Sequence, residues 1–426
     1  MAINSGKRPL RILVYPHDLA VGGSQINAID LAAGARAAGH EVIVYGVPGP
    51  LTGYIAERGL RFVPANATKY RPAPSRIVEL ARIARRERID LIHAYEWPPC
   101  LDAYYGASLL FGVPILCTVL SMSVSAQVPP SVPLIMGTED LGREARARQA
   151  GPVWVIEPPI DVDRDNPSLD GRPFRTEHGL ADEDFLIVSV SRHALDLKLD
   201  SLVRAIDAVE LIGGQHRVVL ALVGDGPARA ALEERAEGVN RRLGRRAIIF
   251  CGQQLDPRGA YAAADLVVAM GSSALRTLAI GRPLIVQGER AFSEIFEPAT
   301  LTMFLNQGFY GLADDAPGAS RLAAQIERLV LDADLRLNLA EYGRQVVVER
   351  FSLERALALQ LEIYSEVIAA RPEKHVGEAV MSGLRALAVE FDNHNPLAKR
   401  RKRRQALALL SAARSGHWPP AADAGA

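Results

Sequence analysis

The chain has 426 residues, of which 23% are charged and 49% hydrophobic. This length predicts two domains, and the balance is typical of a globular chain and excludes a disordered one. The formal net charge is zero, which argues against nucleic acid as a partner of the chain as a whole. The three cysteines lack metal-ligand spacing and indicate reduced thiols in a cytoplasmic protein, and no apolar run is long enough to span a membrane.

The first half alternates short apolar runs with helical patterns. The run Leu10–Pro16 predicts a buried strand, Ser24 predicts the N-cap of a helix over residues 25–38, and Glu41–Tyr45 predicts a second strand. Later runs are continuous in hydropathy rather than alternating, which is typical of parallel strands buried on both faces. We therefore predict a doubly wound, Rossmann-like α/β domain.

Candidate site residues follow two of these strands. The loop after the first strand contains His17 and Gly22-Gly23, which is not a GxGxxG motif, so NAD binding is disfavoured. His93 ends the run Asp90–Ala94 and is a candidate catalytic residue, although a lone histidine at a strand end also fits a structural role. Glu96 fits either a substrate contact or an ordinary loop charge.

A linker rich in proline and aspartate, residues 158–167, separates two series of α/β patterns. It predicts an N-terminal domain over residues 1–165, a C-terminal domain over 166–370, and a helix with a basic tail over 371–426. Aspartates at positions 161, 163 and 165 form D-x-D patterns, but aspartates are common in turns. We favour turn-forming aspartates there and expect no metal site.

Three features of the second half follow predicted parallel strands. They are a basic pair, a glycine-rich turn and a small-residue turn before a helix. Ligands of open α/β sheets bind beyond the carboxyl ends of strands, and cations beside a helix N-terminus bind phosphate groups. We therefore predict a pyrophosphate site. Its residues are Arg192, Lys198, Gly224, Asp225, Gly271, Ser272 and Ser273.

The order of several motifs resembles the GT-B glycosyltransferases, and within them the retaining glycosyltransferase family 4. The resemblance covers about residues 10–370 and is carried by the Gly22-Gly23 loop, Arg192 with Lys198, VGDGP at 223–227, YAAADLVV at 261–268 and GRP at 281–283. It implies two Rossmann-like domains that face a central cleft. It also implies a nucleotide-diphosphate sugar as donor and an acceptor that the sequence does not identify.

The resemblance assigns roles to residues. Arg192 and Lys198 would stabilise the leaving diphosphate, the base would lie near Gly252, and the Gly22-Gly23 loop would close over the phosphates and help to bind the acceptor. Transfer would retain the configuration of the anomeric carbon and would need no metal ion or other cofactor.

The chain departs from this family where the sugar is recognised. The family has two glutamates before its Gly-x-Pro motif, and Arg276 stands where the second is expected. We expect Arg276 to add charge to the phosphate site and Glu289 to take over a contact to a sugar hydroxyl. The departure keeps two alternatives open: a non-catalytic GT-B protein that binds a nucleotide sugar or a partner, and an enzyme resembling the nucleotide-sugar epimerases.

The C-terminal region contains the run Lys399–Arg404, KRRKRR, followed by an apolar helical pattern over residues 405–413. A basic block beside apolar residues is typical of segments that lie on an anionic membrane, where a lipid-linked acceptor would be found. A solvated tail and a contact with nucleic acid are the other interpretations. We expect a cytoplasmic protein, with peripheral membrane association as an alternative to a solvated tail.

Overall fold

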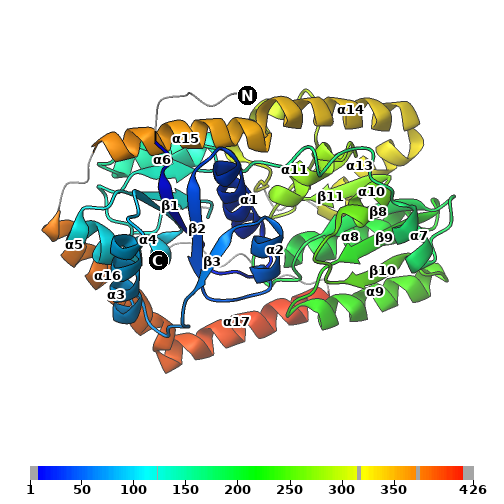
Figure 1. The fold of residues 1–426 in the computed structure, drawn as a ribbon. Helices are drawn as coiled ribbons and strands as arrows, with labels where there is room; N and C mark the ends of the chain where they lie inside the picture. Colours follow the sequence, from blue (N-terminus) through cyan, green and yellow to red (C-terminus); the bar gives the residue numbers. More distant parts are fainter. Residues whose placement is uncertain (1–7, 122, 314–317, 371–374, 416–426) are drawn as a thin grey trace. The chain divides into compact units, whose positions relative to one another are not determined.

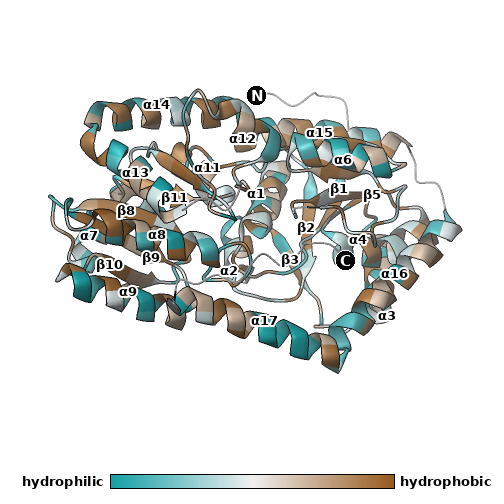
Figure 2. Cartoon of the chain, turned by 180° about the vertical axis from the view of Figure 1, so that it is seen from behind, coloured by the Kyte–Doolittle hydropathy of each residue, from teal (hydrophilic) through white to brown (hydrophobic). Residues whose placement is uncertain are grey.

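The computed structural model describes residues 8–121, 123–313, 318–370 and 375–415. The chain forms two compact units, Met1–Asp161 with Phe351–Asn395 and Val162–Arg350 with Pro396–Ala426. Each unit is a twisted sheet with helices on both faces (Figure 1). Hydrophobic residues concentrate in the strands, whereas the helices alternate in hydropathy (Figure 2). No helix in the described part of the chain combines the length and apolar character needed to cross a membrane.

The first unit has a seven-stranded sheet of order β3-β2-β1-β4-β5-β6-β7, and every described pair in it is parallel. Alternate residues of β1 enter opposite cores: Leu13 packs on one face of the sheet, and Ile12 and Val14 pack on the other. This burial on both faces confirms the interpretation of the continuous apolar runs. The strands are β1 Arg11–Tyr15, β2 Glu41–Gly46, β3 Arg61–Pro64, β4 Leu91–Tyr95, β5 Ile115–Val119, β6 Leu134–Met136 and β7 Val153–Val155.

The helices of the first unit cover these two cores, and α1 and α15 lie on the same face. A π-helical turn, η1 Tyr104–Ser108, connects two further helices, α4 and α5, without a break. The helices are α1 Gly23–Ala37, α2 Thr52–Glu57, α3 Pro74–Arg86, α4 Trp97–Ala103, α5 Leu109–Phe111, α6 Glu139–Arg148, α15 Leu353–Ala370 and α16 Val376–His394.

The second unit has a six-stranded sheet of order β10-β9-β8-β11-β12-β13, in which only β13 is antiparallel to its neighbour among the described pairs. Its strands are β8 Phe185–Val190, β9 Val218–Val223, β10 Ile248–Gly252, β11 Leu266–Ala269, β12 Leu284–Gln287 and β13 Ser293–Ile295. Its helices are α7 Arg172–His178, α8 Leu199–Ile212, α9 Arg229–Leu243, α10 Arg258–Ala263, α11 Ser272–Ala279, α12 Leu301–Gln307, α13 Gly318–Leu331, α14 Ala333–Arg350 and α17 Pro396–Ser415.

The unit boundaries differ from the sequence-based domains. The first unit comprises the chain up to Asp161 and a second segment that starts at Phe351. This second segment belongs to it because Ile363 and Tyr364 of α15 pack in the same core as Ile29 of α1. The region after residue 370 is also not a separate tail. Helix α16 belongs to the first unit, whereas α17 packs on α9 of the second, where the Arg235 guanidinium donates to the Ala413 carbonyl at 3.2 Å.

The start of α1 also differs from the prediction. Gly22, not Ser24, is the N-cap residue, and its backbone is extended. Ser24 lies inside the first turn, where its buried hydroxyl has no hydrogen-bond partner in the described structure. The helix therefore begins two residues closer to the end of β1 than a Ser24 cap would allow, which is little more than half a turn.

Candidate active site

The strand order of the second unit reverses between β8 and β11, which is where open α/β sheets bind ligands. The chain leaves the carboxyl ends of these strands through the loop Ser191–Lys198 and the turn at Gly271. The two segments are tied together, because the Ser273 hydroxyl donates to the Val190 carbonyl at 3.0 Å and lies 2.7 Å from the Tyr261 hydroxyl. The predicted phosphate residues of both segments are therefore neighbours.

The turn after β9 packs directly against the loop after β8. Gly224 has a φ of 147°, and a Cβ atom there would lie 1.9 Å from the Ser191 carbonyl oxygen. Its amide donates to the Gly252 carbonyl at 2.8 Å, which joins the ends of β9 and β10. Glycine is required here because a side chain has no room and φ lies in the left-handed region.

Hydrogen bonds fix the carboxylate of Asp225 within this turn. Its carboxylate accepts from the Gly226 amide at 2.7 Å and from Arg229 at 3.1 Å. The Gly226 amide, followed by Arg229, lowers the pKa of Asp225. The structure thus gives Asp225 a turn-shaping role beside the candidate site.

Three predicted residues come together beside the loop after β8. Burial and the charge of Arg192 lower the pKa of Lys198 to about 8, while the carboxylate of Glu289 opposes the shift. These effects require that Arg192, Lys198 and Glu289 lie within electrostatic reach of one another. Arg192 is exposed and Lys198 is half-buried, so one cation reaches solvent and the other lies against the protein.

The loop that carries Glu289 is braced by residues that the sequence analysis missed. The buried Arg204 guanidinium donates to the Gly288 carbonyl at 2.7 Å and to Gln287 Oε1 at 3.0 Å, and the Tyr310 hydroxyl donates to the Glu289 carboxylate. Arg204 could have been noticed as a charged residue within an otherwise apolar stretch of its helix. Nothing in the sequence distinguishes Tyr310.

Gly271 is the N-cap residue of α11, with φ 62° and ψ −136°. Its amide donates to the Phe309 carbonyl at 2.6 Å. The first amides of a helix have no acceptor within that helix, so those of Ser272 and Ser273 are free of intrahelical bonds. Together with the helix dipole they favour a bound anion at this position. The side chain of Ser273 is engaged as described above, so the backbone is its candidate contribution.

The structure corrects the role expected of Arg276. Its Nε donates to Asp165 Oδ2 at 2.7 Å, and Asp165 is only 3% exposed. The carboxylate neutralises the guanidinium, so Arg276 does not add net charge to a phosphate site. Asp165 is likewise more than a turn residue, because it is a buried partner whose carbonyl also accepts from Arg344 at 3.0 Å.

The first unit has its own reversal of strand order, between β1 and β4. The loop after β1 holds a polar cluster: His17 Nε2 lies 3.1 Å from Asp18 Oδ2, and Gln25 Nε2 donates to Asp18 Oδ1 at 2.6 Å. The hydrogen bond from His17 is the main cause that lowers the pKa of Asp18 to about 2. Gly22 approaches the same cluster, since a Cβ atom there would lie 2.5 Å from Gln25 Oε1. His17, Gly22 and Gly23 are therefore brought together.

His93 is not available to a substrate, which corrects its assignment as a candidate catalytic residue. The side chain is fully buried. Its Nδ1 lies 2.8 Å from the Tyr364 hydroxyl and its Nε2 lies 2.7 Å from the Thr118 hydroxyl. Burial lowers the pKa of His93 to about 3, so the ring is neutral near pH 7. It is a core residue that joins β4, β5 and α15.

Glu96 braces the loop after β5. Its Oε1 accepts from the amides of Leu120 and Ser121 at 2.9 and 3.0 Å, and its Oε2 accepts from the Ser121 hydroxyl at 2.8 Å. The backbone of Glu96 has φ 68° and ψ 170°, a conformation that is otherwise almost confined to glycine. Such strain is found where surrounding structure holds a residue in a functional position. The carboxylate is thus a positioning group for this loop, and its contact with a substrate stays a prediction.

Comparison with known proteins places these features in a family. Residues 21–128 match the model of glycosyltransferase family 4, and residues 184–332 match the model of glycosyl transferases group 1. The chain belongs to the GT-B glycosyltransferases of this type. Over 205 residues it is 29% identical to the lipopolysaccharide core biosynthesis glycosyltransferase LpsE of Rhizobium meliloti, a match that covers 44% of this chain and 55% of LpsE. The chain thus spans about half the length of that curated relative.

Solved structures of glycosyltransferases share the fold. A glycosyltransferase from Rickettsia africae superimposes with a TM-score of 0.69 at 17% identity, over 85% of this chain and 99% of its own. HepE from Anabaena, solved in complex with UDP, superimposes with a TM-score of 0.66 at 17% identity, over 84% of this chain and 100% of its own. At this identity the similarity confirms the predicted fold class and does not assign residues.

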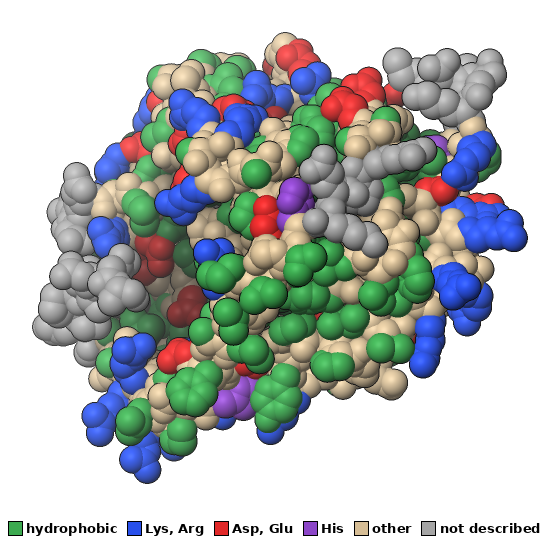
Figure 3. All heavy atoms as spheres, turned by 90° about the vertical axis from the view of Figure 1, so that its left-hand side faces the viewer, with side chains coloured by type: hydrophobic (Ala, Val, Ile, Leu, Met, Phe, Trp, Pro, Cys, Tyr) green, Lys and Arg blue, Asp and Glu red, His purple; other side chains and the backbone are tan. Residues whose placement is uncertain are grey.

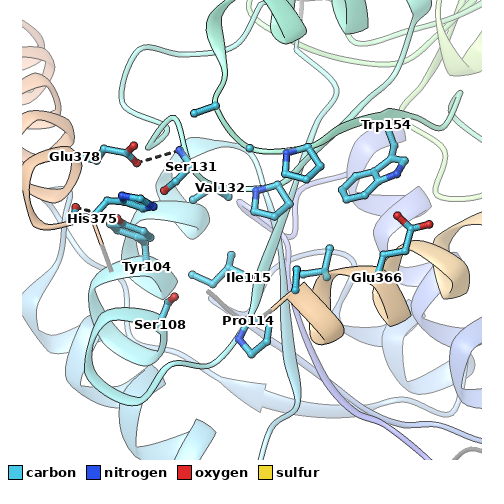
Figure 4. Close-up of a pocket in the computed structure, with 16 residues that line it drawn as sticks. Tyr104, Ser108, Pro114, Ile115, Ser131, Val132, Trp154, Glu366, His375 and Glu378 are labelled. Carbon is cyan, nitrogen blue, oxygen red and sulfur yellow. Dashed lines mark hydrogen bonds between the residues drawn. The ribbon is translucent and has the colours of Figure 1, made fainter. Parts of the chain in front are cut away.

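The first unit also contains a cavity of about 500 Å³ (Figure 4). It lies at the amino ends of β5, β6 and β7, where Pro114, Val132 and Pro152 line it. Glu378 and His375 stand at one end and Trp154 and Glu366 at the other (Figure 4). No predicted site residue lines this cavity, which is at the opposite edge of the sheet from His17 and Glu96.

In the described part of the chain, no group of three or more histidine, cysteine, aspartate or glutamate side chains is arranged to hold a metal ion.

Proposed function

We propose that this glycosyltransferase transfers a sugar from a nucleotide-diphosphate sugar to an acceptor hydroxyl, with retention at the anomeric carbon. The observation that carries the proposal is the convergence of Arg192, Lys198 and Glu289 at the carboxyl edge of the second sheet, beside the N-terminus of α11. Two cations and a helix N-terminus suit a diphosphate. Anabaena HepE, which shares the fold, has been solved in complex with UDP-glucose, which supports this class of donor.

The chemistry that we propose uses charge rather than a protein nucleophile. The bond between the anomeric carbon and the diphosphate oxygen breaks, and the acceptor oxygen bonds to that carbon on the same face. The acceptor proton passes to the leaving diphosphate. Arg192 and Lys198 would stabilise the negative charge that develops on the diphosphate, which is why we propose that no metal ion is needed.

We propose that Glu289 accepts a hydrogen bond from a hydroxyl of the transferred sugar. The brace from Arg204 and Tyr310 fixes the loop that carries it. A fixed acceptor discriminates between sugars better than a mobile one, because a sugar that lacks the hydroxyl leaves the carboxylate without its partner.

We propose that the acceptor is bound by the first unit, at the loop that holds His17 and Gly22-Gly23. The relative LpsE is named for lipopolysaccharide core biosynthesis, which supports a saccharide acceptor carried on a lipid. The run Lys399–Arg404 is exposed along α17 and would hold the chain at an anionic membrane surface as a peripheral protein.

A second candidate function is a protein that binds a nucleotide sugar without transferring it. The observation that favours it is Arg276, which is paired with Asp165 where the family resemblance leads us to expect a glutamate. An enzyme resembling the nucleotide-sugar epimerases shares the same donor site and is a further alternative.

Calorimetric titration of a panel of nucleotide sugars and nucleoside diphosphates tests the donor site. Arg192→Ala should weaken binding by at least about tenfold, since hydrogen bonds to charged groups contribute about 1.5–3 kcal/mol. The matched control is Arg241→Ala on α9, an arginine whose side chain is 75% exposed, which should bind as the natural chain does. Unchanged affinity in Arg192→Ala would show that the phosphate site is misplaced.

Product analysis separates the candidate functions. Slow release of nucleoside diphosphate and free sugar from the donor alone supports a transferase that lacks its acceptor. Conversion to a second nucleotide sugar or to a free sugar with altered configuration supports the epimerase-like enzyme. Tight binding without turnover on any acceptor supports the binding protein.

A further inference from the structure

Helix α16 of the first unit has two apolar faces, and only one of them is covered. Small side chains, Ala379, Ser382 and Ala386, are buried against the unit, and the Tyr105 hydroxyl donates to the Ala379 carbonyl. The other face carries large apolar side chains that are 50–76% exposed. They follow helical spacing and are Val376, Val380, Met381, Leu384, Leu387 and Phe391.

A neighbouring helix extends this surface. The turn η1 packs beneath α16, since a Cβ atom at Gly383 would lie 2.7 Å from the Tyr105 hydroxyl oxygen. Helix α5 continues directly from η1 and exposes Leu110 and Phe111. The side of the molecule where α16, α5 and α3 lie shows a broad hydrophobic area bordered by basic side chains (Figures 1 and 3). We call the exposed residues of α16 and α5 the apolar face.

Cations border the apolar face. The Arg85 guanidinium of α3 lies 5.9 Å from the centre of the Phe111 ring, Arg82 is exposed on the same helix, and Arg385 is exposed on α16. Of the three acids of α16, two are occupied within the unit: Glu378 accepts from the Ser131 amide at 3.0 Å, and Glu390 lies 3.6 Å from His394. The third, Asp392, is exposed.

The sequence continues this pattern of charge. In the sequence, the six consecutive basic residues 399–404 follow α16 after a few residues, with no acidic residue between Asn393 and Arg414, but they lie on α17 of the second unit and are not part of the apolar face. Within the first unit, an apolar face bordered by basic side chains has the chemistry of a surface that lies in the headgroup region of an anionic bilayer.

We propose that the apolar face of α16 and α5 docks on an anionic membrane, with its large side chains inserted among the lipid headgroups. Contiguous exposed apolar side chains mark interaction surfaces. A second copy of the chain suits the face less well than a bilayer, because it carries the same cations. The proposal concerns the first unit and does not depend on the donor chemistry of the second.

Co-sedimentation of the full chain with vesicles tests the proposal. The chain should bind vesicles of phosphatidylcholine with phosphatidylglycerol and should bind vesicles of phosphatidylcholine alone much more weakly. The double variant L384S/L387S should reduce partition into the mixed vesicles by at least about tenfold, because each leucine withdrawn from an apolar environment weakens association by roughly that factor. Both side chains are exposed, so the fold should tolerate the change.

The control variant is Leu337→Ser, which changes an even more exposed leucine of α14 in the second unit and should partition as the natural chain does. Calorimetric affinity for a nucleoside diphosphate should stay unchanged in both variants, which separates this surface from the donor site. Partition that is equal in L384S/L387S and the natural chain would overturn the proposal. So would sedimentation of the natural chain as a dimer that the double variant dissociates, because the face would then belong to a second copy.

Discussion

At the residue scale, Lys198 is a candidate site group whose charge changes in an accessible pH range. Its lowered pKa of about 8 follows from burial and from Arg192. Because the folded state disfavours the proton, the unfolded chain holds more protons between about pH 8 and the ordinary lysine pKa of about 10.4, and this group makes the free energy of unfolding rise with pH in that window.

Ligand binding should show the opposite trend. The ammonium form of Lys198 decreases as the pH rises through about 8, so the affinity for a nucleoside diphosphate should fall by about tenfold from pH 7 to pH 9.5. Lys198→Arg should remove most of this decrease, since its guanidinium stays charged. Calorimetric titration across the range measures both. A decrease of the same size in Lys198→Arg would assign the titration to another group.

His93 should prove structural rather than catalytic. His93→Ala removes two buried hydrogen bonds and leaves a cavity, so it should lower the free energy of unfolding by about 2–4 kcal/mol in urea titrations at neutral pH. The nucleoside diphosphate affinity of the second unit should be unchanged. If the variant kept full stability but lost activity, the corrected role of His93 would itself be wrong.

His93 also makes the free energy of unfolding depend on pH in the acidic range. The pKa of His93 is lowered to about 3 in the folded chain, whereas an unfolded histidine titrates near 6.5. Between these values the unfolded chain binds more protons, so the contribution of His93 to stability is lost as the pH falls from about 6.5 towards 3. His93→Ala should therefore show a weaker loss of stability between about pH 7 and pH 5 than the natural chain.

The pair of Arg276 and Asp165 should be coupled. Removing Arg276 leaves a nearly buried carboxylate without this partner, and Arg276→Ala should lower the free energy of unfolding by about 1–3 kcal/mol, a value reduced from that of a fully buried pair because Arg276 is partly exposed. The double variant with Asp165→Ala should be less destabilised than the sum of the two single variants in urea titrations. Additive effects would contradict the pairing.

At the element scale, the strands were the easiest part to predict. Leu10–Pro16 and Glu41–Tyr45 were placed within a residue or two because strands buried on both faces leave continuous apolar runs. The start of α1 was misplaced because Ser24 is a good cap in isolation, whereas the structure uses Gly22 near Gln25. The sequence also led us to assign α15 to the C-terminal domain, because the apolar face of a helix does not reveal which of the two cores it packs in.

The candidate site was predicted only in part, for a physical reason. Arg192, Lys198 and Glu289 follow strand ends, and parallel topology gathers strand ends at one edge. Burial and partner choice do not follow from position alone. His93 and Arg276 also stand at suggestive positions, but one is in the core and the other is paired with an aspartate more than a hundred positions away in the sequence.

The turn after β9 gives an element-scale prediction. In Gly224→Ala the new methyl group would lie 1.9 Å from the Ser191 carbonyl, so the loop that carries Arg192 must move. Nucleoside diphosphate affinity should fall by at least about tenfold, a fall equivalent to about 1.4 kcal/mol. The matched control is Gly244→Ala, at the end of α9, which has positive φ but open space and should keep its affinity. Equal effects in the two variants would point to backbone conformation rather than contact with the loop.

At the scale of the whole molecule, the two units have corresponding architectures. In each, the order of the strands reverses once, and the predicted site residues other than His93 and Arg276 lie at the carboxyl ends of strands or in the segments that follow them. In the second unit these residues are cations beside a helix N-terminus, whereas in the first they are a polar cluster of His17, Asp18 and Gln25. This difference is why we assign the donor to the second unit and the acceptor to the first.

We propose above all that the carboxyl edge of the second sheet holds the diphosphate of a nucleotide sugar. A crystal structure of the chain with the nucleotide sugar that binds most tightly tests it most directly. We expect the diphosphate oxygens within hydrogen-bond distance of Arg192, Lys198 and the first amides of α11, and a sugar hydroxyl at Glu289. A diphosphate bound elsewhere, such as in the cavity at the amino ends of β5 to β7, would contradict the account.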